Sequence, residues 1–382
     1  MIMADNNENK VLNVPLLRFP EFTDEWKESV LSDFVERVKR KNKNNLCKLP
    51  LTISAQYGLV DQISFFNKVI ASENMSNYYL LHKGDFAYNK SYSSEYPWGA
   101  IKRLDCYEQG TLSSLYICFK PYSHVSSDFL THYFETSKWH QGISEIAVEG
   151  ARNHGLLNVG IQDFFETRHC LPQSLLEQEK IAKFLNLIEE RIATQNKIIE
   201  KLQSLIKGLA VALTTKEKAN IAISQCLECH SSTLQESEVL SSGLCKVFGA
   251  NGLVGYKDVP QMNGDAILVI KDGSGVGTVS YAQGKFSVIG TLNYLTVIGN
   301  NDLRYLYFAL SVFNFQPYKT GMAIPHIYFK DYGKAKIYCP SLAEQKRVAN
   351  VLDKLESKLF VEQELLASFN QQKLYLLGKM FI

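Results

Sequence analysis

The sequence predicts an α+β fold. Two similar mixed α/β domains are separated by two long helices, which form an antiparallel coiled coil with pseudo-two-fold symmetry. Three observations support this prediction: short motifs occur twice at the same spacing, each copy ends in a long helix with heptad periodicity, and short apolar runs typical of strands precede each helix. The duplication is the strongest of the three, because an internal repeat determines the whole fold.

The repeated motifs lie in both globular parts of the chain. The pairs with equal mutual spacing are Gly84-Asp85 with Gly110-Thr111-Leu112, and Gly264-Asp265 with Gly290-Thr291-Leu292. Each copy then continues through a proline into a Ser-Leu-x-Glu-Gln sequence at the start of a long apolar-periodic segment. We therefore expect an N-terminal tail over 1–15, domains over 16–172 and 213–340, and helices over 173–212 and 341–382.

Within each domain we expect a short opening helix followed by strands. The opening helices are predicted over 31–39 and 223–228. The strands with matching places in the two copies are predicted over 85–88 and 115–119, and over 266–270 and 294–298. The loops between them differ more than the strands do, which indicates the same task performed on two different targets.

The two long helices carry heptad seams in the same register. The first seam consists of Leu185, Ile188, Ile192, Gln195, Ile199, Leu202, Ile206 and Leu209. The second consists of Leu352, Leu355, Leu359, Glu362, Leu366, Phe369, Lys373 and Leu376. Each helix of about 40 residues is roughly 60 Å long. Antiparallel pairing brings the midpoints together, so that Gln195 meets Glu362 and not a leucine. The alternative is two independent amphipathic helices, each packed on its own domain.

Composition indicates a soluble globular protein of two or three domains. The chain has 382 residues, a net charge of +2, and an apolar share of 46%. Its first residues show no apolar signal segment, and no run of about 18 apolar residues predicts a membrane span. Eight scattered cysteines do not form a disulfide framework, which favours a reducing cytoplasm.

Motifs for catalysis or metal binding are incomplete. Cys226, Cys229 and His230 have the spacing of a haem attachment site or of half a zinc site with Cys245, but no export signal or second Cys-x-x-Cys accompanies them. The glycine-rich segment from Asp272 is followed by an expected strand, not by a helix N-terminus that would bind phosphate. No GxxxxGK sequence occurs. We therefore expect a non-catalytic chain without a metal or cofactor of its own.

Several basic and polar residues are candidates for DNA binding. One cluster contains Arg37, Lys39, Arg40, Lys41, Lys43 and Lys48, interleaved with Asn42, Asn44 and Asn45. Lys and Arg neutralise phosphates, and Asn reaches base edges. Loop candidates are Lys90, Ser91, Tyr92, Arg152, Asn153, His154, Lys246, Asn251, Lys257, Lys271, Ser274, Lys319, His326 and Lys330. The alternative for each is an ordinary solvated surface position.

Motifs along almost the whole chain resemble one known family, the specificity (S) subunits of type I restriction–modification enzymes. The segments that carry this resemblance are Arg18–Phe22 with Trp26, Leu171–Gln178, Asn251-Gly252 with Gly255, Gly321–Pro325, and Cys339–Gln345. The second domain departs from the family pattern near its start, where no aromatic-Trp entry occurs.

The resemblance implies two target-recognition domains, each of which binds one half of a bipartite, asymmetric double-stranded DNA site. It also implies two methyltransferase (M) subunits on the conserved helices, and restriction (R) subunits that join them. S-adenosylmethionine would then belong to M, and ATP with magnesium to R. The alternative function is a coiled-coil scaffold that holds two protein-interaction domains and does not bind DNA.

Overall fold

The computed structural model describes residues 13–147, 155–321 and 323–382, and it divides into two compact units. Unit 1 comprises Met1–Ala193 together with Ala367–Ile382, and unit 2 comprises Thr194–Leu366. The long helices are α5 (Leu175–Thr214) and α9 (Leu342–Met380). One part of each helix belongs to unit 1 and the other part belongs to unit 2.

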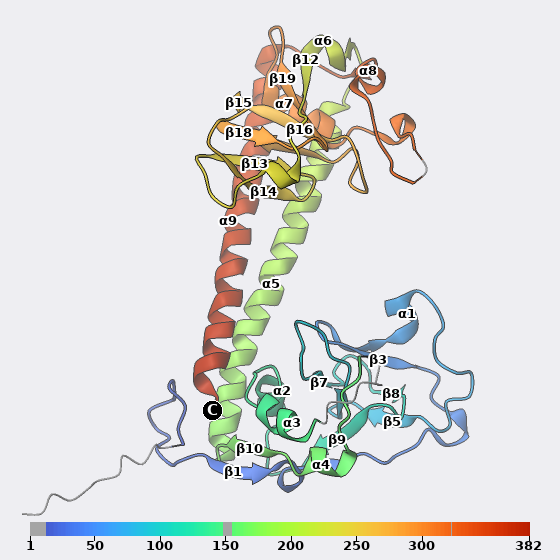
Figure 1. The fold of residues 1–382 in the computed structure, drawn as a ribbon, viewed down its shortest axis with the longest axis vertical. Coiled ribbons are helices and arrows are strands. Elements are labelled where there is room, and N and C mark those ends of the chain that lie inside the picture. The colour runs from blue at the N-terminus through green and yellow to red at the C-terminus, as the bar shows by residue number, and fades with distance from the viewer. Residues whose placement is uncertain (1–12, 148–154, 322) are drawn as a thin grey trace, which may run out of the picture. The chain divides into compact units, whose positions relative to one another are not determined.

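Unit 1 contains a domain of short helices and strands (Figure 1). It is built on a four-stranded antiparallel sheet with the order β2-β9-β6-β7. Its strands are β1 (Lys27–Val30), β2 (Val35–Arg37), β3 (Leu51–Ser54), β4 (Gly58–Asp61), β5 (Tyr79–His82), β6 (Phe86–Asn89), β7 (Ala100–Arg103), β8 (Gln109–Leu112), β9 (Ile117–Pro121) and β10 (Arg168–Leu171). Its short helices are α1 (Gln62–Phe66), α2 (Ser127–Tyr133), α3 (His140–Ile146) and α4 (Ile161–Phe165). Strands β3 and β4 form a hairpin, and β5 pairs with β8.

Unit 2 repeats this arrangement. Its strands are β11 (Ile221–Ala222), β12 (Leu227–Ser231), β13 (Cys245–Gly249), β14 (Gly252–Lys257), β15 (Met262–Asn263), β16 (Ala266–Ile270), β17 (Val279–Ala282), β18 (Lys285–Val288), β19 (Leu292–Val297) and β20 (Lys336–Ile337). Its short helices are α6 (Ile223–Cys226), α7 (Leu303–Ser311) and α8 (Phe329–Tyr332). The order β12-β19-β16-β17 matches β2-β9-β6-β7 strand for strand. The duplication predicted from the sequence is therefore present in the sheet topology.

The opening helix predicted over 31–39 is wrong. Leu31–Asp33 makes only one 3-10 turn, and the chain then enters β2, which pairs with β9. The helix predicted over 223–228 is confirmed only for its first four residues, because α6 ends at Cys226 and β12 begins at Leu227. Both segments leave their turn for the edge of the central sheet. There, backbone pairing and burial outweigh helix propensity.

Within each unit, α5 and α9 run in opposite directions. In unit 1, Glu189 Oε1 accepts from Lys373 Nζ at 2.7 Å, while Arg191 lies over the ring of Phe369. Residue numbers of the contacting partners therefore increase along α5 while they decrease along α9, as they must for antiparallel helices. In unit 2, Ala210 near the end of α5 packs in one cluster with Val348 near the start of α9. The antiparallel pairing predicted from the sequence is confirmed.

All sixteen predicted seam positions are buried or half-buried. The polar pair meets within unit 2, where Gln195 Nε2 donates to Glu362 Oε2 at 2.5 Å and to the Glu362 main-chain oxygen at 2.9 Å. Gln195 is only 5% exposed, so its amide needs these acceptors. Such a polar pair in an apolar seam fixes the register of two helices.

In each unit, an equivalent glutamine near the start of the long helix joins that helix to the globular domain. In unit 1, Gln178 Oε1 accepts from Ser126 N and its Nε2 donates to Pro172 O, both at 2.8 Å. In unit 2, Gln345 makes the equivalent bonds to Asp302 N and Pro340 O, again at 2.8 Å. The Ser-Leu-x-Glu-Gln motif therefore joins the last strand, the long helix and the N-terminus of α2 or α7.

Candidate nucleic-acid interface

The loops that follow β6 and β16 are held by the same backbone pairing in the two units. In unit 1, Leu157 N donates to Lys90 O at 2.9 Å, and Tyr92 N donates to Gly155 O at 3.1 Å. Ser91 forms the bridge between them, with Leu156 as its partner. We call residues 90–92 together with 155–157 the unit 1 clasp.

The same three-rung pairing occurs in unit 2. Ile327 N donates to Lys271 O and Gly273 N donates to Pro325 O, both at 2.9 Å. Asp272 and His326 form the bridge between these two bonds. We call residues 271–273 together with 325–327 the unit 2 clasp. The two clasps thus share backbone geometry and an initial lysine, Lys90 or Lys271, but their other side chains differ.

The unit 2 clasp brings together four of the residues predicted as DNA contacts. Lys271 and His326 belong to the clasp itself, and Ser274 directly follows residues 271–273. Lys319 precedes Thr320, whose amide donates to His326 O while His326 N donates back to Thr320 O. The tight turn between them includes Gly321 at φ +86°, where an added Cβ would lie 2.4 Å from Ile324 O. Only glycine fits that turn.

The unit 1 clasp contains three further predicted contacts. Tyr92 is 51% exposed, Ser91 is exposed, and Lys90 is half-buried. Ser91 N donates to Asn89 Oδ1 at 3.0 Å, which fixes the start of the loop. The predicted residues Arg152, Asn153 and His154 lie outside the described part of the chain.

Several side chains of the basic segment 37–48 make contacts within their own domain, where the sequence predicted contacts with DNA. Arg40 forms an ion pair with Asp85, and Arg37 Nη2 donates to Tyr79 OH at 3.3 Å. Lys41 Nζ donates to Asn77 O at 2.8 Å and lies 3.8 Å from the centroid of the Tyr79 ring. These three side chains are therefore held within the domain. The exposed cations of the segment are Lys39, Lys43 and Lys48.

Two of its three asparagines are also structural. Asn42 is buried, and its amide exchanges two hydrogen bonds of 2.9 Å with the backbone of Cys47. Asn45 Nδ2 donates to Glu73 O, and its Oδ1 accepts from Met75 N. The expectation that these amides reach base edges is wrong, because both are used to shape the loop. Asn44 is exposed.

The remaining candidates are separate from the clasps in the contacts that the structure shows. Lys246 and Lys257 lie on the hairpin of β13 and β14, and Asn251 lies in its turn. Lys330 lies on α8, with its Nζ 5.1 Å from the centroid of the Tyr328 ring.

The buried carboxylate beneath the basic segment has a perturbed titration. Burial raises the pKa of Asp85 above its usual range, although His82 N donates to it at 2.7 Å and Arg40 lies against it. In unit 2 the equivalent Asp265 is exposed and accepts from Tyr281 OH at 2.9 Å. The aspartate of the repeated Gly-Asp motif is therefore paired with an arginine in unit 1 and with a tyrosine hydroxyl in unit 2.

The cysteine and histidine motif does not converge on one point. Cys226 ends α6, whereas Cys229 and His230 are neighbours on β12 and so point to opposite faces of the sheet. His230 Nε2 lies 2.9 Å from Thr296 Oγ1, and its ring stacks on Tyr294. Among the described residues, no three His, Cys, Asp or Glu side chains gather as metal ligands would.

A carboxylate that sequence reasoning missed fixes the entry of unit 1. Glu177 is 2% exposed and accepts from Arg18 through both carboxylate oxygens, at 2.7 and 2.8 Å. It also accepts from Trp26 Nε1 at 3.1 Å. The signal was present in the sequence, since Arg18, Trp26 and Glu177 all lie in segments that carry the family resemblance. Their contacts join segments far apart in the chain, which residue spacing alone does not reveal.

A family model for the type I restriction modification DNA specificity domain matches residues 230–371. This range includes the unit 2 clasp and most of α9. Residues 230–371 form a type I DNA specificity domain. The resemblance to type I specificity subunits inferred from the sequence is thereby confirmed.

Relatives of this specificity domain agree with the match. Over 110 residues the chain is 24% identical to the type I restriction enzyme EcoprrI specificity subunit of Escherichia coli. That alignment covers 29% of this chain and only 27% of the relative's length. The crystal structure of a type I restriction-modification S subunit from M. genitalium has a TM-score of 0.62 at 17% identity, and covers 97% of this chain and 99% of that one.

A second solved chain has the same fold. It comes from a structural study of complex assembly and conformational transition in a type I R-M system, and its TM-score is 0.55 at 16% identity, over 93% of this chain and 97% of that one. Specificity subunits are the non-catalytic part of these enzymes, so the match agrees with the expectation that this chain is not itself an enzyme. No helix among the described residues combines the length and hydropathy needed to cross a lipid bilayer.

Proposed function

We propose that this chain is the specificity subunit of a cytoplasmic type I restriction–modification system. In this role it binds a bipartite, asymmetric double-stranded DNA sequence, one half-site with each unit. The observation that carries the proposal is the pair of clasps: equivalent loops on equivalent sheets share three backbone contacts and, apart from the lysine that begins each clasp, carry different side chains. A common scaffold with unlike loops suits two different half-sites.

The DNA contacts are assigned by chemistry and exposure. At unit 1 we propose Lys90, Ser91 and Tyr92 of the clasp, with phosphate contacts from Lys39, Lys43 and Lys48. At unit 2 we propose Lys271, Ser274, Lys319 and His326, which the structure brings together, with Lys246, Asn251, Lys257 and Lys330 as outlying contacts. Arg152, Asn153 and His154 remain candidates from the sequence alone. Arg37, Arg40 and Lys41 are assigned to the fold.

The antiparallel helices act in this proposal as the spacer between half-sites. The arrangement expected from the sequence, two equal antiparallel helices with one domain before each, would suit half-sites on opposite strands. The boundaries expected from the sequence, 16–172 and 213–340 for the target-recognition domains, define the segments that would be exchanged to change specificity.

The outer faces of the helices are proposed to bind two M subunits. In unit 2, Phe360 and Val361 are 62% and 61% exposed on α9. In unit 1, Leu374 and Tyr375 are 71% and 60% exposed on the same helix. A coiled coil without a partner normally has polar residues at such positions. S-adenosylmethionine would be bound by M, and ATP with magnesium by the R subunits.

Mapping of methylated adenines in host DNA tests this function. With the chain present we expect one split motif, two short sequences separated by an unread spacer, to be methylated, and we expect that motif to lose methylation when the chain is deleted. The alternative, a scaffold that does not bind DNA, predicts that every methylated motif persists. That outcome would overturn the proposal.

A further inference from the structure

One residue of the unit 2 clasp carries a charge that phosphates repel. Asp272 lies between Lys271 and Gly273 and forms the backbone bridge with His326. It is half-buried, and its carboxylate has no hydrogen-bond or ion-pair partner among the described residues. Such a carboxylate is stable against DNA only where it accepts from a donor on a base, because the phosphates around it are negative. Asp272 therefore points to a base that offers a donor.

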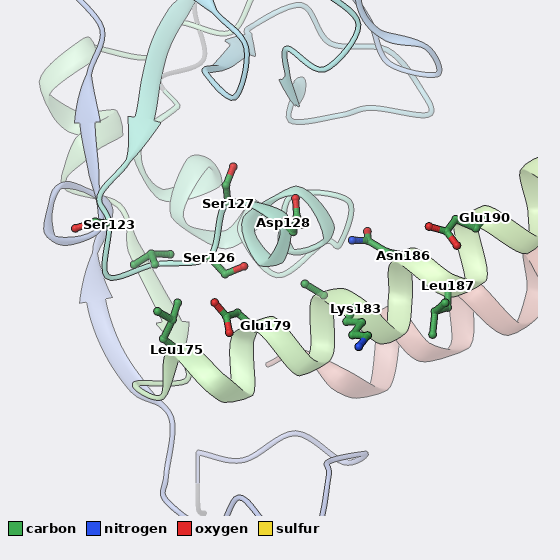
Figure 2. Close-up of a pocket in the computed structure, with 12 residues that line it drawn as sticks. Ser123, Ser126, Ser127, Asp128, Leu175, Glu179, Lys183, Asn186, Leu187 and Glu190 are labelled. Carbon is green, nitrogen blue, oxygen red and sulfur yellow. The ribbon is translucent and has the colours of Figure 1, made fainter.

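Exposed carboxylates also occur where no DNA contact is expected. In unit 1, Glu179 and Glu190 line the groove between α5 and the segment that begins α2 (Figure 2). Solvent satisfies carboxylates on such a helix surface, so they indicate no ligand. Asp272 differs because it lies inside the backbone pairing that brings four predicted DNA contacts together.

The backbone pairing fixes where the Asp272 side chain lies. The two backbone bonds of the clasp flank Asp272 and His326, which makes these residues a non-hydrogen-bonded pair of an antiparallel ladder. The Cα atoms of such a pair are about 4.5 Å apart, and both side chains point to the same face. His326 is also held from its other side, since its N donates to Thr320 O at 2.8 Å and Thr320 N donates back to its O at 2.9 Å. The two side chains therefore occupy the centre of a small sheet of three segments.

The pair of Asp272 and His326 presents hydrogen-bond acceptors to a ligand. His326 Nδ1 lies 3.2 Å from Ile324 O. A carbonyl oxygen can only accept, so Nδ1 carries the proton, and Nε2 of the neutral ring is left as an acceptor. The ionised carboxylate of Asp272 also only accepts. The pair therefore suits a base edge that donates.

We propose that Asp272 accepts from the N4 amino group of a cytosine in the half-site of unit 2, while Lys271 and Lys319 neutralise the flanking phosphates. Paired strands fit the major groove, which is about 12 Å wide, and not the narrower minor groove. In the major groove, guanine and thymine present only acceptors to hydrogen bonds, and adenine presents its N7 acceptor beside its amino group. Cytosine alone presents a donor without a neighbouring acceptor of its own. This inference rests on the proposed function, since it names the base that the unit 2 clasp reads.

The unit 1 clasp has different chemistry at the same place. Ser91 and Leu156 are its bridge partners. Leu156 is 39% exposed and offers no acceptor, and the hydroxyl of Ser91 both donates and accepts. This pair does not distinguish cytosine by its amino group. The requirement for cytosine should therefore apply to the half-site of unit 2 alone.

The test uses the complex of this chain with its purified M subunits, and the probes are double-stranded oligonucleotides that carry the methylated split motif. Exchange of residues 213–340 first shows which half of the motif belongs to unit 2. Each G·C pair of that half is then replaced in turn by A·T, and at one position this should weaken binding to the parent complex by about tenfold or more. For Asp272→Ala the same replacement should cost less than about twofold. Asp272→Asn should favour A·T at this position, because an amide bonds both N6 and N7 of adenine.

Two controls separate base reading from folding and from general charge. Glu236→Ala removes an exposed carboxylate of unit 2 outside the clasp and should leave every base preference unchanged. Asp272→Asn keeps the shape of the side chain and should leave the melting temperature unchanged, because the carboxylate has no partner to lose among the described residues.

A unit 2 half-site without a G·C pair, or Asp272 variants with the base preferences of the parent, would overturn the inference. Equal gains in affinity for all sequences would also overturn it, because Asp272 would then act on phosphates alone. The proposed function would stand in each of these cases. It would itself be overturned if deletion of the chain left every split motif methylated.

Discussion

The substitution Glu177→Ala should destabilise unit 1 far more than the same substitution at the equivalent position of unit 2. Glu177 is 2% exposed and satisfies Arg18, whose side chain is 12% exposed, and Trp26. Its removal leaves a nearly buried guanidinium without a counter-charge, which costs about 3–5 kcal/mol. Glu344 occupies the equivalent position, but within the described part of the chain its carboxylate forms an ion pair only with Arg347, whose side chain is 72% exposed. Glu344→Ala should therefore change stability little.

Urea denaturation measures this difference. The three tryptophans, Trp26, Trp98 and Trp139, all lie in unit 1, so their fluorescence reports that unit, while circular dichroism follows both. With a denaturant slope of about 2–3 kcal/mol/M, the unit 1 midpoint should fall by roughly 1–2 M for Glu177→Ala. Glu177→Gln retains an acceptor for the indole and should lose less. Equal midpoint shifts for the alanine variants of Glu177 and Glu344 would refute the reasoning.

Three other predictions concern the seam, the core and the DNA surface. The double variant Gln195→Leu/Glu362→Leu should melt at a higher temperature, since it replaces a polar seam pair by apolar packing, and a lower melting temperature would show that the pair stabilises the coil. Burial lowers the pKa of His169 to about 4, from 6.5 in the unfolded chain, so about 3 kcal/mol of stability should be lost as pH falls from 7 to 4. His169→Asn should lack that component in urea titrations across this range, and an identical pH dependence would contradict the assignment. Lys43→Gln/Lys48→Gln should weaken DNA binding by the assembled complex about equally for all sequences and flatten its salt dependence, whereas an unchanged salt slope would remove these lysines from the interface.

Periodicity and duplication predicted the helices and the repeat, because both are written in residue spacing. The seam from Leu185 to Leu209 and its counterpart from Leu352 to Leu376 is buried or half-buried throughout. Strand positions such as Ala266–Ile270 followed from continuous apolar runs. The opening helix over 31–39 failed because Phe34, Val35 and Val38 are buried in and beside an edge strand, and apolar spacing over so short a segment does not distinguish strand from helix.

The candidate site was predicted less completely. Sequence reasoning selected Lys271 and His326 as loop residues, but their adjacency depends on a backbone bridge between segments more than 50 residues apart. It also assigned Arg40 to DNA, because an exposed cation and a cation paired with a buried carboxylate have the same sequence signature. The role of Gln178 and Gln345 was hidden for a similar reason: a helix-start motif does not reveal which backbone amide its side chain will accept from.

Exchange of residues 16–172 for the corresponding domain of a related specificity subunit tests the central claim most directly, with methylated motifs in host DNA as the measurement. We expect one half of the split motif to change to the donor's half-site, while the other half and the spacer length stay the same. A motif unchanged in both halves, or altered in both, would contradict the assignment of one half-site to each unit.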